Sequence, residues 1–166
     1  MPTYFTPPTP TYIPLATITL ASADSEIVFS SIPAGYRDLI LVVDGIPTAS
    51  TSTIGARFNS DSGSNYTYVE AGGNGSVTYS SAGSFTGNII GFLTTAARIQ
   101  MQLQVMDYSV TDKFKTSLVR QSAAGEAVAM RATRWANTAA VTSISVFTSS
   151  STFAIGSTFS LFGIAG

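Results

Sequence analysis

The chain has 166 residues, with 8 Lys and Arg against 9 Asp and Glu, and its formal net charge is −1. The absence of His and Cys excludes Ser-His-Asp triads, imidazole and thiolate catalysis, disulfides and zinc sites built on those ligands. A charge this small, without clustered Lys and Arg, offers no electrostatic attraction for nucleic acid or an anionic membrane.

Residues 1–14, MPTYFTPPTPTYIP, are predicted to form an extended N-terminal arm. They hold five of the seven prolines, which fix φ and remove backbone donors, so a helix or an interior strand is excluded. Aromatic and proline side chains in such an arm are candidates for contact with a neighbouring subunit, although the arm could also fold onto its own domain or remain disordered. The candidate partner-contact residues are Tyr4, Phe5, Pro7, Pro8, Pro10 and Tyr12.

Residues 15–166 are predicted to form a single β domain of about ten short strands. The first two segments, 15–20 and 26–31, flank a polar turn and are expected to pair as a hairpin. Residues 72–87 are rich in Gly and Ser and are expected to form a long exposed loop with one short strand. The remaining predicted strands are 36–44, 54–59, 65–71, 88–93, 98–108, 114–121, 126–135, 141–148 and 158–164.

The clearest periodicity lies in 98–108, RIQMQLQVMDY, where apolar and polar residues alternate strictly. Period two is typical of a strand with one buried and one wet face, and two such sheets bury their apolar faces against each other. We therefore expect an antiparallel β-sandwich. Segment 36–44 has no polar face, so both of its sides are expected to be covered.

The composition favours a protein that binds other proteins. Charged residues make up 10% of the chain, against about 25% in typical soluble domains, and the mean hydropathy is +0.29. Polar side chains on the surface must come largely from the 23 Ser and 22 Thr. Such a surface is expected to be covered in part by copies of the chain or by another protein. No signal peptide or membrane-spanning run is expected.

Segment 59–65 with Glu70 resembles a calcium loop, because oxygen-bearing side chains alternate and a Glu stands at the twelfth place. Calcium sites usually hold several carboxylates, and only Asp61 and Glu70 are charged here. The other interpretation is a tight turn between strands, in which Asp and Gly serve the backbone. No metal is predicted.

Three further kinds of site can be compared with the residues present. The nine acidic residues are scattered singly, unlike the carboxylate pair of a glycosidase, so no catalytic residue is predicted. The basic residues of the second half could form a nucleic-acid platform. The other interpretation is that they are strand side chains that face solvent or pair with acidic residues. These residues are Lys113, Lys115, Arg120, Arg131 and Arg134. The third candidate is a sugar-stacking platform formed by Trp135, Tyr66, Tyr68 and Tyr79. The alternative is that these rings pack in the core.

Four segments taken together resemble a group of virion proteins of tailed bacteriophages. They are SIPAGYRDLIL at 31–41, RFNSDSGSNY at 57–66, DYS with KFKT at 107–116, and GSTFSLFGI at 156–164. Members of this group are capsid decoration, head-fibre or tail-fibre related. The resemblance implies a jelly-roll β-sandwich, commonly trimeric, mounted on the virion, and it carries no catalytic residues.

The layout distinguishes two functions within that group. A compact domain with a short arm fits a cement protein on the capsid surface, which would bind the major capsid protein and its own copies as a homotrimer. The alternative is a head- or tail-fibre domain that binds a host glycan, with the 72–87 segment carrying specificity. A sugar- or small-molecule-processing enzyme is least favoured, because His and Cys are absent.

Overall fold

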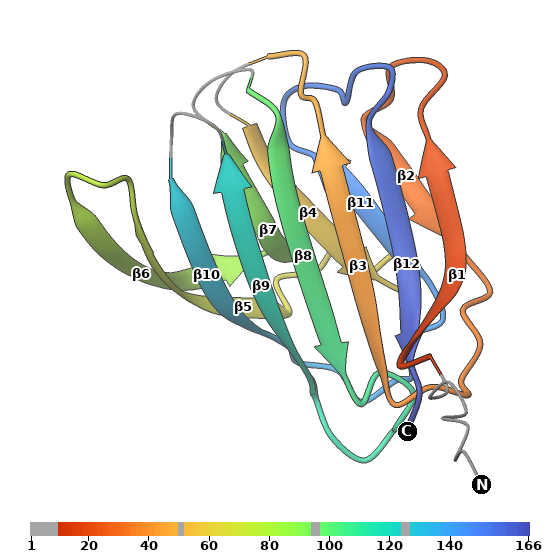
Figure 1. Ribbon diagram of the computed structural model, residues 1–166. Helices are drawn as coiled ribbons and strands as arrows, with labels where there is room; N and C mark the ends of the chain where they lie inside the picture. The colour runs from red at the N-terminus through yellow and green to blue at the C-terminus, as the bar shows by residue number, and fades with distance from the viewer. Residues whose placement is uncertain (1–9, 50–51, 94–96, 124–126) are drawn as a thin grey trace, which may run out of the picture.

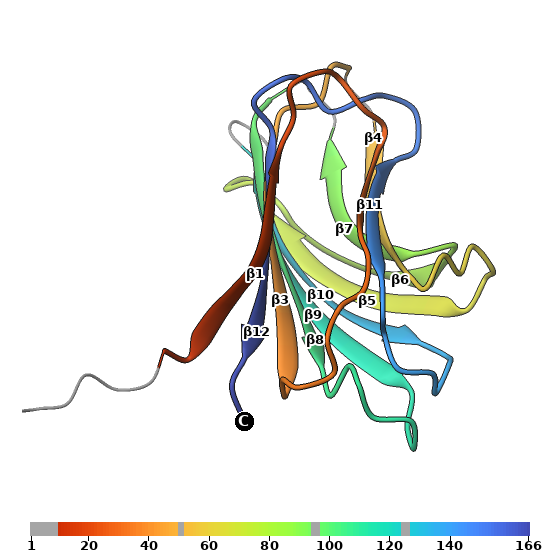
Figure 2. The same cartoon turned by 90° about the vertical axis from the view of Figure 1, so that its right-hand side faces the viewer.

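The computed structural model describes residues 10–49, 52–93, 97–123 and 127–166, and in these ranges it is a β-sandwich without helices (Figure 1). Two antiparallel sheets face each other, one of eight strands and one of four (Figure 2). The expected antiparallel β-sandwich is therefore confirmed. The described residues include no helix long and apolar enough to cross a membrane.

The eight-stranded sheet has the order β1-β12-β3-β8-β9-β10-β5-β6. In that order its strands are Tyr12–Thr19, Thr158–Ile164, Asp38–Gly45, Ile99–Met106, Lys115–Ala123, Val128–Trp135, Tyr66–Gly73 and Thr78–Phe85. The four-stranded sheet has the order β2-β11-β4-β7. Its strands are Glu26–Phe29, Ile144–Thr148, Ser52–Phe58 and Asn88–Leu93.

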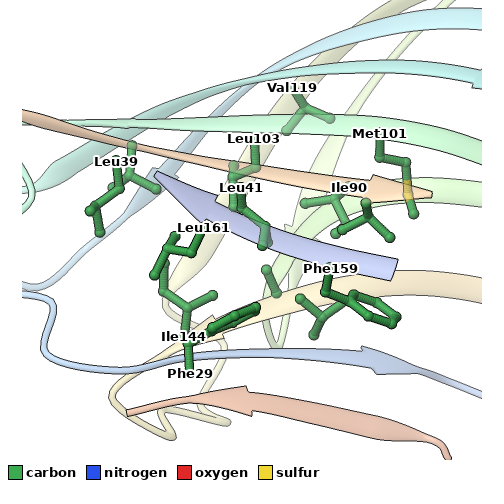
Figure 3. Packing of buried hydrophobic residues seen from close by; sticks show 14 of the residues in the cluster. Phe29, Leu39, Leu41, Ile90, Met101, Leu103, Val119, Ile144, Phe159 and Leu161 are labelled. Atoms are coloured by element: carbon green, nitrogen blue, oxygen red, sulfur yellow. The ribbon is translucent and has the colours of Figure 1, made fainter. Parts of the chain in front are cut away.

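The core lies between the sheets, because the strands alternate as the sequence indicates. In β8, Ile99, Met101, Leu103 and Val105 are buried and the intervening residues are more exposed. Figure 3 shows Leu103 and Val119 on one sheet packed toward Ile144 and Phe29 on the other. Burial of this apolar surface, at about 25 cal/mol per Å², supplies the main stabilising term.

The expected hairpin of the first two strands is wrong. β1 pairs with β12 and β2 pairs with β11, so the two strands belong to different sheets. The polar turn between them is a crossover from one sheet to the other. A turn signal indicates where a strand ends, but the partner is decided by which faces bury apolar residues against one another.

Strand β1 begins at Tyr12, so it includes the last three residues of the predicted arm. Pro14 is tolerated there because β1 is an edge strand and its register shifts between Pro14 and Ala16; edge strands and bulges are the places in a sheet where proline occurs. The root of the arm is thus part of the sandwich.

The expected loop at 72–87 is instead mostly strand. β5 and β6 form a hairpin paired in register from Tyr66 with Phe85 to Gly73 with Thr78. Almost all of β6 is exposed on both faces, and the hairpin extends beyond the four-stranded sheet (Figure 1). Such a strand carries no apolar alternation, which is why its sequence reads as a loop.

The expectation that both sides of 36–44 are covered holds in part. Leu39, Leu41 and Val43 face the core, and Ile40 on the other side is 3% exposed. Val42, however, is 40% exposed on the outer face of the sheet.

Candidate functional site

The 59–65 segment serves the fold. Asn59 and Ser60 have φ of 52° and 58°, a left-handed conformation that Asn adopts more readily than most residues. The Asn59 amide nitrogen donates to the Ala140 carbonyl at 2.7 Å, and its oxygen accepts from the Thr142 backbone N–H at 2.8 Å. The turn is therefore hydrogen-bonded to the segment that precedes β11.

The Asp61 carboxylate is surrounded by donors. It accepts the Gly63 backbone N–H at 2.8 Å, the Asn65 side-chain amide at 2.9 Å and the Trp135 indole N–H at 2.7 Å. Burial raises the pKa of Asp61, but these hydrogen bonds outweigh it and the pKa lies below its ordinary value. Donors on both oxygens occupy the positions that a cation would need, so the tight-turn interpretation is the one that the geometry supports.

Glu70 lies in the interior, away from any cation loop. It makes a bidentate pair with Arg131, at 3.0 Å to Nε and 2.9 Å to Nη2, and both side chains are almost fully buried. Arg131 also donates to the Gln121 side-chain oxygen at 2.8 Å, and Gln121 pairs with both backbone groups of Phe92. This network joins β5, β10 and β9 to β7 in the opposite sheet.

The candidate sugar platform is not assembled from its four residues. Trp135 and Tyr66 are each 1% exposed and stack with centroids 6.2 Å apart, with Phe58 edge-on to both. Burial raises the pKa of Tyr66 to about 12. Core packing is thus the role of these two rings.

Tyr68 lies on β5 and Tyr79 on β6 of one hairpin, and each ring covers a glycine of the other strand. The Tyr79 ring covers Gly72, where an added Cβ would lie 2.5 Å from the ring, and the Tyr68 ring covers Gly83. Tyr79 is 40% exposed. Its pKa is raised by partial burial, the Glu70 charge and a hydrogen bond to that carboxylate.

Two of the five basic residues proposed for a nucleic-acid platform are buried. Lys115 is fully buried, and its ammonium donates to the carbonyls of Val110, Lys113 and Thr138. Burial lowers the pKa of Lys115. Arg131 is buried as well, so the expectation of solvated strand side chains is wrong for these two residues. Lys113 pairs with Asp107 at 2.9 Å, as expected.

The arm candidates fall in two groups. Tyr4, Phe5, Pro7 and Pro8 lie outside the described residues. Pro10 is exposed, and Tyr12, 53% exposed, pairs in register with Ile164 at the start of β1. The Ala165 backbone N–H donates to the Thr11 carbonyl at 3.1 Å, so the arm begins at a fixed point on the sheet edge.

The outer face of the eight-stranded sheet carries a groove of about 400 Å³ between β8 and β5. Its apolar lining comes from Val69 and Ala71 on β5, Leu118 on β9, and Met130 and Ala132 on β10. Val69 and Met130 are each 62% exposed and Leu118 is 49% exposed. We call these five residues the apolar groove; sequence reasoning missed it, although the alternation of β9 and β10 places Leu118 and Met130 opposite the core.

The described part of the chain holds no group of three or more Asp or Glu side chains that could bind a metal ion. Four ion pairs are found among the described residues, namely Arg37–Asp38, Arg98–Asp44, Lys113–Asp107 and Arg131–Glu70. Comparison of the chain with protein-family models and with curated proteins yields no match.

Proposed function

We propose that this chain is a structural protein of a tailed-bacteriophage virion, a cement or decoration protein that binds and stabilises the assembled shell. The observation that carries the proposal is the distribution of side chains. The buried charges Arg131, Glu70 and Lys115 are used in internal contacts, whereas apolar side chains stand exposed on the outer face of a complete sandwich. Such a surface suits protein contacts.

The sandwich would be of jelly-roll type and would assemble as a homotrimer on the capsid surface. Its contacts would be with the major capsid protein and with its own copies, through the N-terminal arm and the exposed face. A protein that binds only the assembled shell stabilises that shell by mass action, by RT ln(1 + [L]/Kd). No catalytic group is needed for this function.

The test uses empty shells of the phage whose genome encodes the chain, purified without this protein. The full chain should co-sediment with the shells and raise their disassembly temperature. A variant lacking residues 1–9 should lose binding while keeping its circular dichroism spectrum, because β1 begins only at Tyr12. A deletion to residue 14 would be unsuitable, since it removes part of β1. Undiminished binding of the shorter variant would contradict the role of the arm.

A second function, glycan binding by a head- or tail-fibre domain, is favoured by the β5–β6 hairpin. This hairpin projects from the sandwich (Figure 1) and carries Tyr79, which is 40% exposed; exposed aromatic rings on loops can stack on sugars. A glycan array should then give a hit that Tyr79→Ala abolishes. Trp135 is unsuitable for this test because it is 1% exposed.

A further inference from the structure

The apolar groove requires an occupant that matches its chemistry. Besides the five apolar residues, it is lined by Gln102, Gln104 and Arg120, and Glu70, which contributes to its wall, is buried and paired with Arg131. The only charged side chain that faces outward in this lining is therefore Arg120. The matching ligand is an uncharged apolar segment whose backbone carbonyls can accept hydrogen bonds.

The chain itself contains such a segment. Residues 1–9, MPTYFTPPT, carry no charged side chain and include Tyr4 and Phe5 beside three prolines. Proline-rich segments favour polyproline II, in which carbonyls have no internal partner, and each proline lacks an N–H donor. Arg120 donates to the Gln102 side-chain oxygen, and this leaves the Gln102 amide N–H₂ directed to other acceptors. Apolar lining and amide donors together are suited to a proline-rich strand.

The position of the arm decides which copy supplies it. Pro10 lies at β1, which is four strands from β9 and five from β10 in the sheet order; at about 4.8 Å per strand this is about 19–24 Å. In polyproline II, Phe5 lies about 16 Å and Tyr4 about 19 Å from Pro10. In its own subunit, the arm would thus leave both rings short of the centre of the groove.

A neighbouring copy has no such restriction. Figure 2 shows the start of β1 turning to the side of the eight-stranded sheet that faces away from the four-stranded sheet. The strand that follows the arm therefore starts on the side of the sheet where the groove opens. We propose that residues 1–9 of one copy bind in the apolar groove of a second copy, with Tyr4 and Phe5 packed against Leu118 and Met130. This inference rests on the oligomer contacts of the proposed function and names the surface that makes them.

Disulfide trapping tests the proposal directly, because the chain has no cysteine. Full-length Phe5→Cys, labelled with ¹⁵N, is mixed with unlabelled full-length Leu118→Cys and mildly oxidised. We expect a disulfide between positions 5 and 118 of two different chains, identified by mass spectrometry of non-reduced peptides. The matched control is Val28→Cys, which is 54% exposed on β2 of the other sheet and should not form the link.

The possible results are distinguishable. In a double variant that carries both Phe5→Cys and Leu118→Cys, a disulfide within one chain and none between chains would overturn the assignment to a second copy. Equal trapping at positions 28 and 118, or none at either, would overturn the groove as the binding site. Met130→Glu should lower the yield by on the order of tenfold, since a charge would be buried beneath the arm, whereas Val28→Glu should not.

Sedimentation of the same variants gives a second readout on the purified full chain without shells. Wild type should sediment as an oligomer and Met130→Glu as a smaller species, with unchanged circular dichroism. Because no shell is present, loss of the arm–groove contact and loss of shell binding are measured separately. Self-association without shell binding would contradict the proposed binding to the shell and leave this inference standing. Shell binding without self-association would contradict this inference, together with the proposed homotrimer, and leave the proposed binding to the shell standing.

Discussion

The buried pair of Glu70 and Arg131 gives the sharpest stability prediction. Replacing Glu70 with Ala removes two hydrogen bonds, of 3.0 and 2.9 Å, from a guanidinium that is fully buried. Breaking a buried ion pair from one side is expected to cost about 3–5 kcal/mol, because the remaining charge has no compensating partner. For a domain of this size that corresponds to a fall in Tm of roughly 6–20 °C.

Urea unfolding followed by fluorescence measures this change. The chain has one tryptophan, and Trp135 is 1% exposed, so its emission reports exposure of the core. The variants are compared at one fixed protein concentration, since self-association would otherwise contribute to the apparent stability.

Two controls separate the pair from its surroundings. The double variant Glu70→Leu with Arg131→Met replaces both charges by apolar side chains and should recover most of the stability lost. Asp44→Ala removes a partner from Arg98, which is 55% exposed, and should change the midpoint far less. A loss of less than about 1 kcal/mol in Glu70→Ala, or a double variant as unstable as the single one, would show that an unpaired Arg131 charge is not the cause of the instability.

Three further predictions concern other contacts. The pKa of Asp61 is lowered in the folded chain, so the ionised carboxylate stabilises the fold above the unfolded pKa near 3.9, and this stabilisation is lost as pH falls through the folded pKa. The stability of Asp61→Asn should therefore depend less steeply on pH in that acid range than the stability of wild type. Lys115→Met leaves three carbonyls without their donor and should cost about 1–3 kcal/mol in urea unfolding. Gly163→Ala places a Cβ 2.3 Å from the Tyr36 ring and should lower stability by about 1–3 kcal/mol through overpacking, whereas Gly35→Ala, which meets nothing within 4 Å, should change Tm little.

The sequence predicts the strands wherever one face is apolar and the other polar. The alternation in 98–108 is found as β8, with Leu103 among the most buried side chains, because period two follows directly from strand geometry. The sandwich follows from the same rule. The partners of the strands could not be predicted, because β1 and β12 pair residues that are 139 (Thr19 with Thr158) to 152 (Tyr12 with Ile164) positions apart. The sequence around each strand does not indicate such a distant partner.

In the candidate site, too, local contacts could be predicted from the sequence and distant contacts could not. The 59–65 segment could be interpreted correctly as a turn, because Asn, Asp and Gly supply local backbone contacts. The burial of Lys115 and Arg131 could not be predicted, because Lys and Arg side chains usually lie at the surface. Each is satisfied by partners from distant segments, Thr138 for Lys115 and Glu70 for Arg131, which only the folded chain brings together.

The phase of β10 leaves an apolar side chain exposed on the outer face of the sheet. The strand turns Ala129, Arg131, Thr133 and Trp135 inward and Val128, Met130, Ala132 and Arg134 outward. A shift by one residue would exchange the two sets, so that Trp135 would leave the core and Arg134 would enter it. The observed phase keeps Trp135 at 1% exposure, requires a buried Arg131–Glu70 pair and leaves Met130 62% exposed. A partner that covers the outer face would remove the free-energy penalty of exposing Met130, because this side chain then becomes buried in the assembly.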